Sequence, residues 1–185
     1  SATVNLHSVT STSWVAYTFG AHNTASYYGR VYDAEGKRPG SVELYIPQMK
    51  IDSSAPGVSG SQNTAAWATS KTISVNTTDD RSGVTSVTYT GPQSGSMSRV
   101  SGNETNGGWR SGSLTAAGAY TITATDQAGN QKQTTVNVTN IDRTGPTVTA
   151  EQETNDWAQQ KAVLATVEDS QSGVSSVFWS KSSGA

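Results

Sequence analysis

The chain has 185 residues, a net charge of −2 and no cysteine, and hydrophobic residues make up 33% of it. This length predicts one or two domains, and the near-neutral charge excludes the strongly basic surface by which proteins bind nucleic acid or anionic membranes. No apolar run approaches the roughly 20 residues of a membrane-spanning helix, so no membrane insertion is expected. The lack of cysteine excludes a disulfide framework.

Four short strands are predicted in the first 52 residues, where apolar and polar positions alternate. They cover residues 4–9, 14–19, 27–32 and 42–46. Pro39-Gly40 supplies a turn before the last of them. A linker over Ile51–Pro56 offers little to bury and closes with proline, which indicates a boundary between two units.

Residues 53–142 contain seven predicted strands and no segment with a helical period of 3.6. The strands cover residues 57–60, 72–77, 84–90, 96–100, 111–115, 120–125 and 134–139. Between the last two, Asp126–Asn130 is a predicted turn, because Asp and Asn bind nearby backbone and Gly129 permits positive φ. Short strands separated by turn signals every 8–12 residues or so are typical of an antiparallel β-sandwich.

Residues 143–185 repeat the beginning of the preceding stretch. Ile51–Pro56 recurs as Ile141–Pro146, an offset of 90. The same offset relates Val58 and Val148, Trp67 and Trp157, Lys71 and Lys161, Asp79 and Asp169, Ser82-Gly83-Val84 and Ser172-Gly173-Val174, Val87 and Val177, and Tyr89 and Trp179. Only three strands are predicted here, at residues 147–150, 162–167 and 174–179. So many matches at one spacing indicate a tandem repeat.

The first stretch fits the same repeat with a small insertion. Asp33 stands 93 residues before Asp126, whereas Asp52 stands 90 before Asp142, so three extra residues lie in its last hairpin. We therefore divide the chain into the C-terminal part of a first unit (1–52), a complete unit (53–142) and the N-terminal part of a third (143–185). The two partial units are complementary. They could complete one sandwich within a chain, or between chains by strand exchange.

Three segments, DDRSGVTSVTYT, YTITATDQAGN and NIDRTGPTV, resemble bacterial Ig-like repeat domains of Gram-positive surface proteins. The resemblance covers residues 51–177, and residues 19–32, with HNTASYYGRVY, are similar to a streptococcal-type surface repeat. It implies an all-β fold of tandem Ig-like antiparallel β-sandwich units of about 90 residues. It also implies an extracellular setting, in the bacterial cell wall or secreted, which agrees with the missing cysteines.

Three functions follow from this resemblance, and the sequence leaves them open. The first is a non-catalytic stalk or adhesive module. The second is a carbohydrate-binding accessory module of a secreted glycosidase, and the third is a module that captures a host protein such as an immunoglobulin. The expected partner is thus a host protein or a glycan. Exposed aromatic rings arranged in a plane would favour the carbohydrate-binding module, and buried rings would favour the stalk.

Trp109 is the candidate ligand-binding residue, together with Arg110 and Asn106. These residues belong to a polar, glycine-rich stretch that predicts a loop, where an aromatic ring beside Arg can stack on a sugar or a protein partner. The alternative is that Trp109 closes one end of the sandwich. Trp67 and Trp157 occupy one repeat position and are expected to pack in the core or at its edge rather than to bind a ligand.

Asp79, Asp126 and Asp142 are the residues that would hold Ca²⁺, which binds six to eight oxygens. Asp52 joins Asp79 only if the fold brings them together. The interpretation that we favour is that these aspartates form Asx-type turns, so no cofactor is expected.

No enzymatic activity is expected either. His7 and His22 are the only histidines, and no serine lies in a G-x-S-x-G motif. The resemblance to Gram-positive stalk domains also suggests an isopeptide bond between Lys71 and Asn137, but strand alternation predicts that both side chains point outward.

Overall fold

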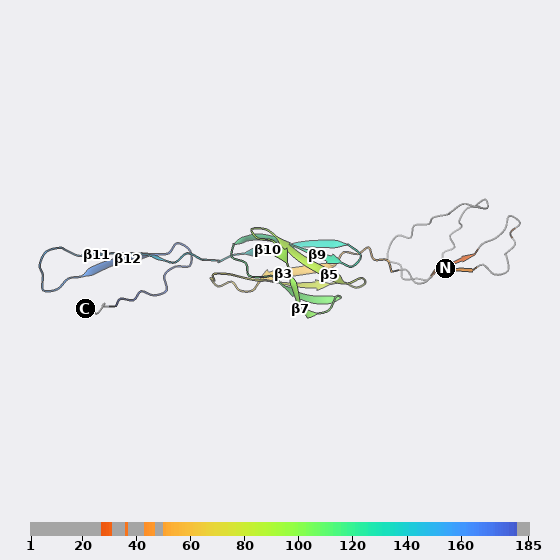
Figure 1. The fold of residues 1–185 in the computed structure, drawn as a ribbon, viewed down its shortest axis with the longest axis horizontal. Coiled ribbons are helices and arrows are strands. Elements are labelled where there is room, and N and C mark those ends of the chain that lie inside the picture. The colour runs from red at the N-terminus through yellow and green to blue at the C-terminus, as the bar shows by residue number, and fades with distance from the viewer. Residues whose placement is uncertain (1–26, 31–35, 37–42, 47–49, 181–185) are drawn as a thin grey trace.

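The structure is a computed structural model and describes residues 27–30, 36, 43–46 and 50–180 (Figure 1). In this part of the chain all regular elements are strands, and every sheet is antiparallel. The all-β prediction is confirmed at this level. None of the described residues forms a helix long and apolar enough to cross a bilayer.

The middle unit, residues 53–142, contains two four-stranded sheets. One has the order β3 (Gly57–Gln62), β4 (Ile73–Thr78), β8 (Asn106–Arg110), β7 (Ser98–Gly102). The other has the order β10 (Gln131–Val138), β9 (Gly118–Asp126), β5 (Val84–Thr90), β6 (Gly95–Ser96). Buried residues from both sheets form one cluster, an arrangement consistent with a β-sandwich.

Strict alternation places one face of each central strand in the core. In β4 the odd-numbered positions are buried and the even-numbered ones exposed, and in β9 the buried positions start at Tyr120. The core consists of Ile73, Val75, Val84, Val87, Tyr89, Met97, Trp109, Leu114, Tyr120, Ile122, Ala124, Val136 and Val138. Burying one such aliphatic side chain contributes about 1.5–3 kcal/mol. The Tyr120 hydroxyl donates to Ala116 O at 2.8 Å, and burial, reinforced by Tyr89, raises the pKa of Tyr120.

The predicted strand over residues 111–115 is wrong, because the strand lies earlier, at β8. Its glycines lie in the strand and do not form a loop, and both leave little space for a side chain. A Cβ on Gly107 would lie 2.9 Å from Trp109 Nε1, and one on Gly108 would lie 2.3 Å from Ser101 Oγ. The remaining predicted strands of the middle unit are present within a few residues. The predicted turn at Asp126–Asn130 is also confirmed, with Gly129 at φ 93°.

One side of the middle unit is closed by β3 and β10, the outer strands of the two sheets. At the end of β3, Gln62 Oε1 accepts a hydrogen bond from the N–H of Thr139, the residue after β10, at 2.8 Å, and Gln62 Nε2 donates to Thr139 Oγ1 at 3.3 Å. Both strands start at the end of the unit that holds Asp79 and Asp126, so they run in the same direction.

Strand pairing beyond the middle unit follows the sequence offset. β11 (Thr147–Gln152) and β12 (Val163–Glu168) pair with Thr147 opposite Glu168. Ninety residues earlier, Gly57 lies opposite Thr78 in β3 and β4. The β11–β12 hairpin therefore has the register of β3–β4.

The N-terminal hairpin follows the offsets of 93 and 90. β1 (Tyr27–Arg30) pairs with β2 (Glu43–Ile46), and Tyr27 lies opposite Ile46. The corresponding residues in β9 and β10 are Tyr120 and Val136, which also lie opposite each other. The other two strands predicted in this segment, at residues 4–9 and 14–19, lie outside the described residues.

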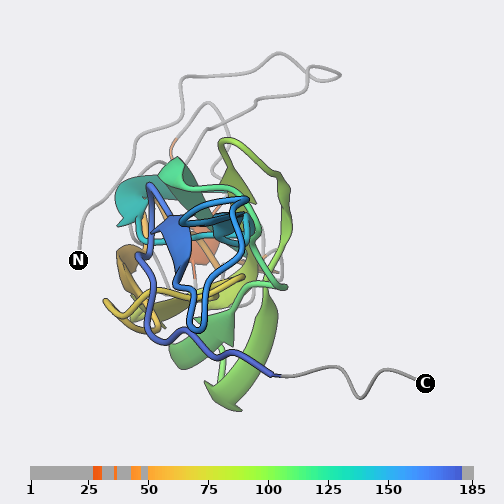
Figure 2. The ribbon, with the colours of Figure 1, turned by 90° about the vertical axis from the view of Figure 1, so that its left-hand side faces the viewer.

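Residues 174–179 do not form the predicted strand, because no described strand pairs with them. Their side chains are accessible, with Phe178 88% and Trp179 92% exposed. β1 and β2 pair only with each other among the described strands. The terminal segments therefore do not complete each other within one chain in the described part. Figure 2 shows the C-terminal segment in blue, facing the viewer.

Candidate functional site

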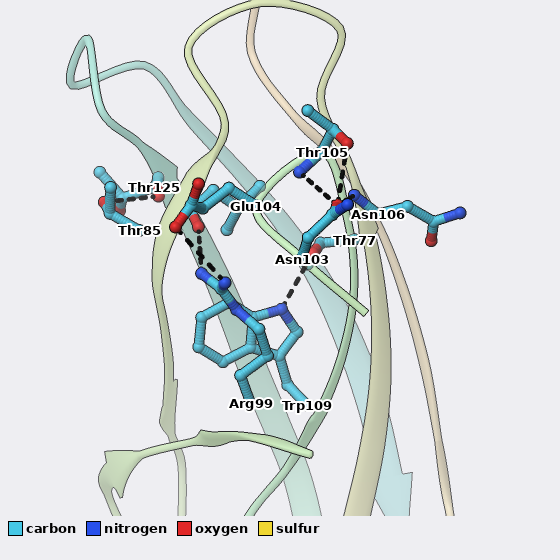
Figure 3. A network of polar contacts seen from close by, with 10 residues as sticks. Thr77, Thr85, Arg99, Asn103, Glu104, Thr105, Asn106, Trp109 and Thr125 are labelled. Carbon is cyan, nitrogen blue, oxygen red and sulfur yellow. Dashed lines mark hydrogen bonds and ion pairs between the residues drawn. The ribbon is translucent and has the colours of Figure 1, made fainter. Parts of the chain in front are cut away.

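Trp109 is a core residue of β8, so the prediction that it lies in a polar loop is wrong. Its ring is 5% exposed, and its Nε1 donates a hydrogen bond to Thr77 Oγ1 at 2.9 Å (Figure 3). The Arg99 guanidinium lies 4.9 Å from the ring centroid, and its Nη2 donates to Val84 O at 3.0 Å. The ring thus contacts protein groups and is not available for stacking on a ligand.

The three predicted ligand-binding residues do not share one surface. Asn106 and Arg110 are exposed, while Trp109 points to the buried face of the same strand. The turn before β8 is closed by Asn103, whose Oδ1 accepts bonds from Thr105 N, Thr105 Oγ1 and Asn106 N (Figure 3). The residues that lead into β8 are therefore hydrogen-bonded to one another.

Trp67 is 46% exposed, so of the two packing positions predicted for it, the core position is wrong. It belongs to a loop, residues 64–68, that holds the linker after β10. Ala68 N donates to Asn140 O at 3.1 Å, and Asp142 N donates to Ala68 O at 3.0 Å. Asn140 Nδ2 also donates to Ala65 O at 2.7 Å. Its equivalent, Trp157, is fully exposed.

Lys71 is buried beneath this loop, although alternation predicts that it points outward. Its side chain is 1% exposed, and Nζ donates to Thr64 O at 2.7 Å and to Ala66 O. Asn137 is exposed in β10, as predicted. Lys161 Nζ makes the equivalent bond to Thr154 O at 3.0 Å, so the same loop support recurs 90 residues later.

Asp52 ties the preceding linker to the middle unit. Its Oδ1 accepts from Ser54 N at 2.9 Å, and its Oδ2 accepts from Ser82 N at 3.1 Å. Its carbonyl accepts from Asn130 Nδ2 at 3.3 Å. Asp52 and Ser82 are not among the site residues predicted from the sequence, although both recur at the offset of 90, as Asp142 and Ser172.

The same bonds recur at the next linker. Asp142 Oδ1 accepts from Thr144 N at 2.9 Å, and Oδ2 accepts from Ser172 N at 3.0 Å. The Ser172 side chain also binds this carboxylate, and together with the Thr144 amide it lowers the pKa of Asp142. Each linker aspartate therefore caps its own turn and bonds to the unit that follows it.

Three carboxylates converge at the first linker. Asp52, Asp79 and Asp126 each contribute an oxygen, and these oxygens lie within 4.8 Å of one another. Two oxygens bound to one Ca²⁺ at about 2.3–2.6 Å lie at most about 5 Å apart, so the spacing suits a hard cation. Asp142 is not among the residues of this carboxylate cluster, so its prediction as a partner of Asp79 and Asp126 is wrong for the described residues.

The cluster also contains the predicted Asx-type turns. Asp79 Oδ1 accepts from Arg81 N at 3.0 Å and Gly83 N at 2.8 Å. Asp126 accepts from Asn130 N and Asn130 Nδ2, both at 2.8 Å. These donors offset part of the repulsion between three like charges.

Two shallow polar clefts flank the carboxylate cluster. One, of about 490 Å³, is lined by Ser54, Ala55, Gly57, Thr78, Asp79, Asp80 and Thr105. The other, of about 680 Å³, is lined by Lys50, Ile51, Asp52, Asp80, Arg81, Ser82, Gln127 and Ala128. Their groups are carboxylates, hydroxyls and amides, with two cations at the rim, which suits ion binding and linker attachment. His7 and His22 lie outside the described residues.

In comparisons with known proteins, no protein-family model matches the chain, and no curated protein matches it either.

Proposed function

We propose that this chain is a non-catalytic segment of Ig-like repeats from a bacterial cell-surface or secreted protein, and that it acts as a stalk or adhesive module. One observation carries the proposal. The bond from Ser82 N to Asp52 recurs as the bond from Ser172 N to Asp142, at the same offset and nearly the same distance. A stalk needs such a repeated, fixed connection, since its reach depends on how each unit is oriented on the next.

Contacts on both sides of a linker support this role. Before Asp142, the backbone of Ala68 makes two hydrogen bonds with the linker, and after it Ser172 bonds to the Asp142 carboxylate. Each such bond contributes about 0.5–1.5 kcal/mol. Several together restrict a linker that would otherwise behave as a flexible chain.

The location of the aromatic side chains favours a stalk over the carbohydrate-binding module. In the middle unit Tyr89, Trp109 and Tyr120 are buried, and Trp67 alone is partly exposed among its described aromatic residues. A single half-exposed ring does not form a plane on which successive sugars can stack.

Small-angle X-ray scattering of the full chain tests the linker bonds. We expect Asp142→Ala to increase flexibility and change the distribution of intramolecular distances, because Ser172 and Thr144 lose their acceptor. Asp80→Ala, at an exposed carboxylate in the turn between β4 and β5, is the control and should leave the curve unchanged. Identical curves for all three proteins would remove the support for a fixed stalk.

Binding to a glycan array, run beside a pull-down from host serum with the immobilised chain, tests the adhesive role. Capture of a serum protein supports an adhesive module. Selective binding to one glycan class would favour the accessory module of a secreted glycosidase instead.

A further inference from the structure

Lys71 is a buried cation beneath the loop over residues 64–68. Its side chain is 1% exposed, and it lies two residues before the buried Ile73. Its Nζ donates to Thr64 O at 2.7 Å and to Ala66 O, and no carboxylate forms an ion pair with it among the described residues. Burying an ammonium without a carboxylate is costly, and an apolar side chain of similar size is often at least as stable in such a position. The role of this lysine therefore lies in the loop to which it bonds.

The two carbonyls that Lys71 binds belong to alternate residues of the loop, Thr64 and Ala66. The carbonyl between them, Ala65 O, accepts instead from Asn140 Nδ2 of the linker at 2.7 Å. Each peptide group is planar, so an ammonium that holds the groups on both sides of this carbonyl limits the directions in which Ala65 O can point. The loop thus bonds to the lysine and to the linker through neighbouring peptide groups.

The linker has an uncommon backbone conformation where it meets the loop. Asn140 has φ 58°, and in the described part of the chain it is the only residue other than glycine with a positive φ. The loop holds it on both sides, because Ala68 N donates to Asn140 O at 3.1 Å and Asp142 N donates to Ala68 O at 3.0 Å. The left-handed region is a minority conformation for a residue with a side chain, so these bonds select it. The path of the linker out of the middle unit therefore depends on the loop.

The loop and its lysine recur together 90 residues later. Lys161 Nζ donates to Thr154 O at 3.0 Å, as Lys71 Nζ does to Thr64 O. The bonds at the base of each loop recur as well, and they join Asn63 N to Thr72 O, Thr72 N to Asn63 Oδ1, Glu153 N to Ala162 O, and Ala162 N to Glu153 Oε2. The side chain at the base of the loop differs between the two copies, whereas the lysine is the same. The bond from the lysine is thus part of the repeated loop.

We propose that Lys71 is a positioning residue for the linker, and that its ammonium holds the loop in the shape that binds Asn140 and Asp142. The contacts are continuous from Lys71 through the loop to Asp142, whose carboxylate accepts from Ser172 N at 3.0 Å. The inference rests on the proposed function, because it names the side chain on which a fixed linker depends.

Amide hydrogen exchange of the full chain, followed by NMR, tests this role. Lys71→Met removes the ammonium and keeps an apolar side chain of similar length. We expect the N–H groups of Ala68 and Asp142, which donate across the contact between loop and linker, to exchange about tenfold faster or more. Lys132→Met, at an exposed lysine of β10, is the matched control and should leave both rates unchanged. Amides of β9 as protected as in wild type show that the middle unit is folded. Unchanged rates in Lys71→Met would overturn the proposal.

A chemically matched pair of proteins isolates the ammonium itself. The chain has no cysteine, so Lys71→Cys introduces a single thiol that can be alkylated in urea before refolding. Its thiolate displaces bromide from 2-bromoethylamine, which restores an ammonium at nearly the reach of Lys71 Nζ, or from 1-bromopropane, which adds a chain of equal length without a charge. We expect exchange at Ala68 and Asp142 to be as slow as in wild type after aminoethylation and faster after propylation. Equal rates in the two proteins contradict a role of the ammonium.

Small-angle scattering separates this proposal from the stalk. If Lys71→Met speeds exchange while Asp142→Ala leaves the scattering curve unchanged, the role of Lys71 stands and the fixed stalk is contradicted. If Asp142→Ala changes the curve while Lys71→Met leaves exchange unchanged, the linker is fixed without the lysine and the proposal is wrong.

Discussion

The Trp109 indole nitrogen donates a hydrogen bond to Thr77 Oγ1 across 2.9 Å, in a part of the core where Thr77 is 0% exposed. We expect Trp109→Ala to lower the free energy of unfolding by about 3–5 kcal/mol, because it leaves a large cavity. Thr77→Val nearly keeps the volume but removes the acceptor of the Trp109 bond and the donor to Gly107 O, so its cost should be about 1–3 kcal/mol. Urea denaturation measures both. A Trp109→Ala variant as stable as wild type would contradict the burial of the ring.

Trp67→Ala should cost less than about 1 kcal/mol, since nearly half of that side chain already contacts solvent. The same urea denaturation, with Trp109→Ala as the reference for a buried ring, measures the difference. Similar losses for the two tryptophans would contradict the exposed position of Trp67.

Millimolar Ca²⁺ should raise the melting temperature of the middle unit by about 4 °C or more, and a chelator should reverse the rise. The physical reason is the convergence of Asp52, Asp79 and Asp126, whose mutual repulsion a divalent cation would relieve. Asp52→Asn should abolish the rise. Asp142→Asn is the control because Asp142 lies outside the carboxylate cluster. No calcium effect on wild type would leave the Asx-type turns as the full explanation of these aspartates.

The carboxyl of Asp142 should titrate below its ordinary pKa in a pH series followed by NMR, because the Ser172 side chain and the Thr144 amide bond to its charged form. A lowered folded-state pKa means that the contact stabilises the linker above the unfolded-state pKa, and that this contribution is lost as the pH falls through the folded-state value. Ser172→Ala should move the midpoint back upward. If the midpoint does not change in that variant, Ser172 is not the main cause of the shift.

Period-2 alternation was enough to predict most strands of the middle unit, because one face of each sheet is buried and the other is exposed. Strand pairing also followed the sequence repeat. In the structure Tyr27 lies opposite Ile46, just as Tyr120, 93 residues after Tyr27, lies opposite Val136, 90 residues after Ile46. Local pattern and tertiary pairing agree in these elements, so the sequence alone could predict them.

Composition misled where a residue type had two physical uses. Gly107 and Gly108 predict a loop by their type, yet a Cβ on Gly107 would lie 2.9 Å from Asn103 O and from Trp109 Nε1, and one on Gly108 would lie 2.3 Å from Ser101 Oγ. Trp67 recurs as Trp157, which predicted a packed position. The recurrence has a second explanation, because the loop over residues 64–68 that bonds to the linker also recurs. The carboxylate cluster was only partly predicted, since residues 52, 79 and 126 meet only through the tertiary fold.

The Gln62–Thr139 pair has a mechanical consequence. Tension on the chain enters the middle unit at the start of β3 and leaves it at the end of β10, and these two strands lie side by side and run in the same direction. A pull would therefore load their contacts lengthwise, in shear. Contacts loaded in shear must all break at the same time, whereas the hydrogen-bonded pairs of a hairpin pulled at its open end break one after another. We infer that the unit resists extension best along the direction in which its two linkers leave it.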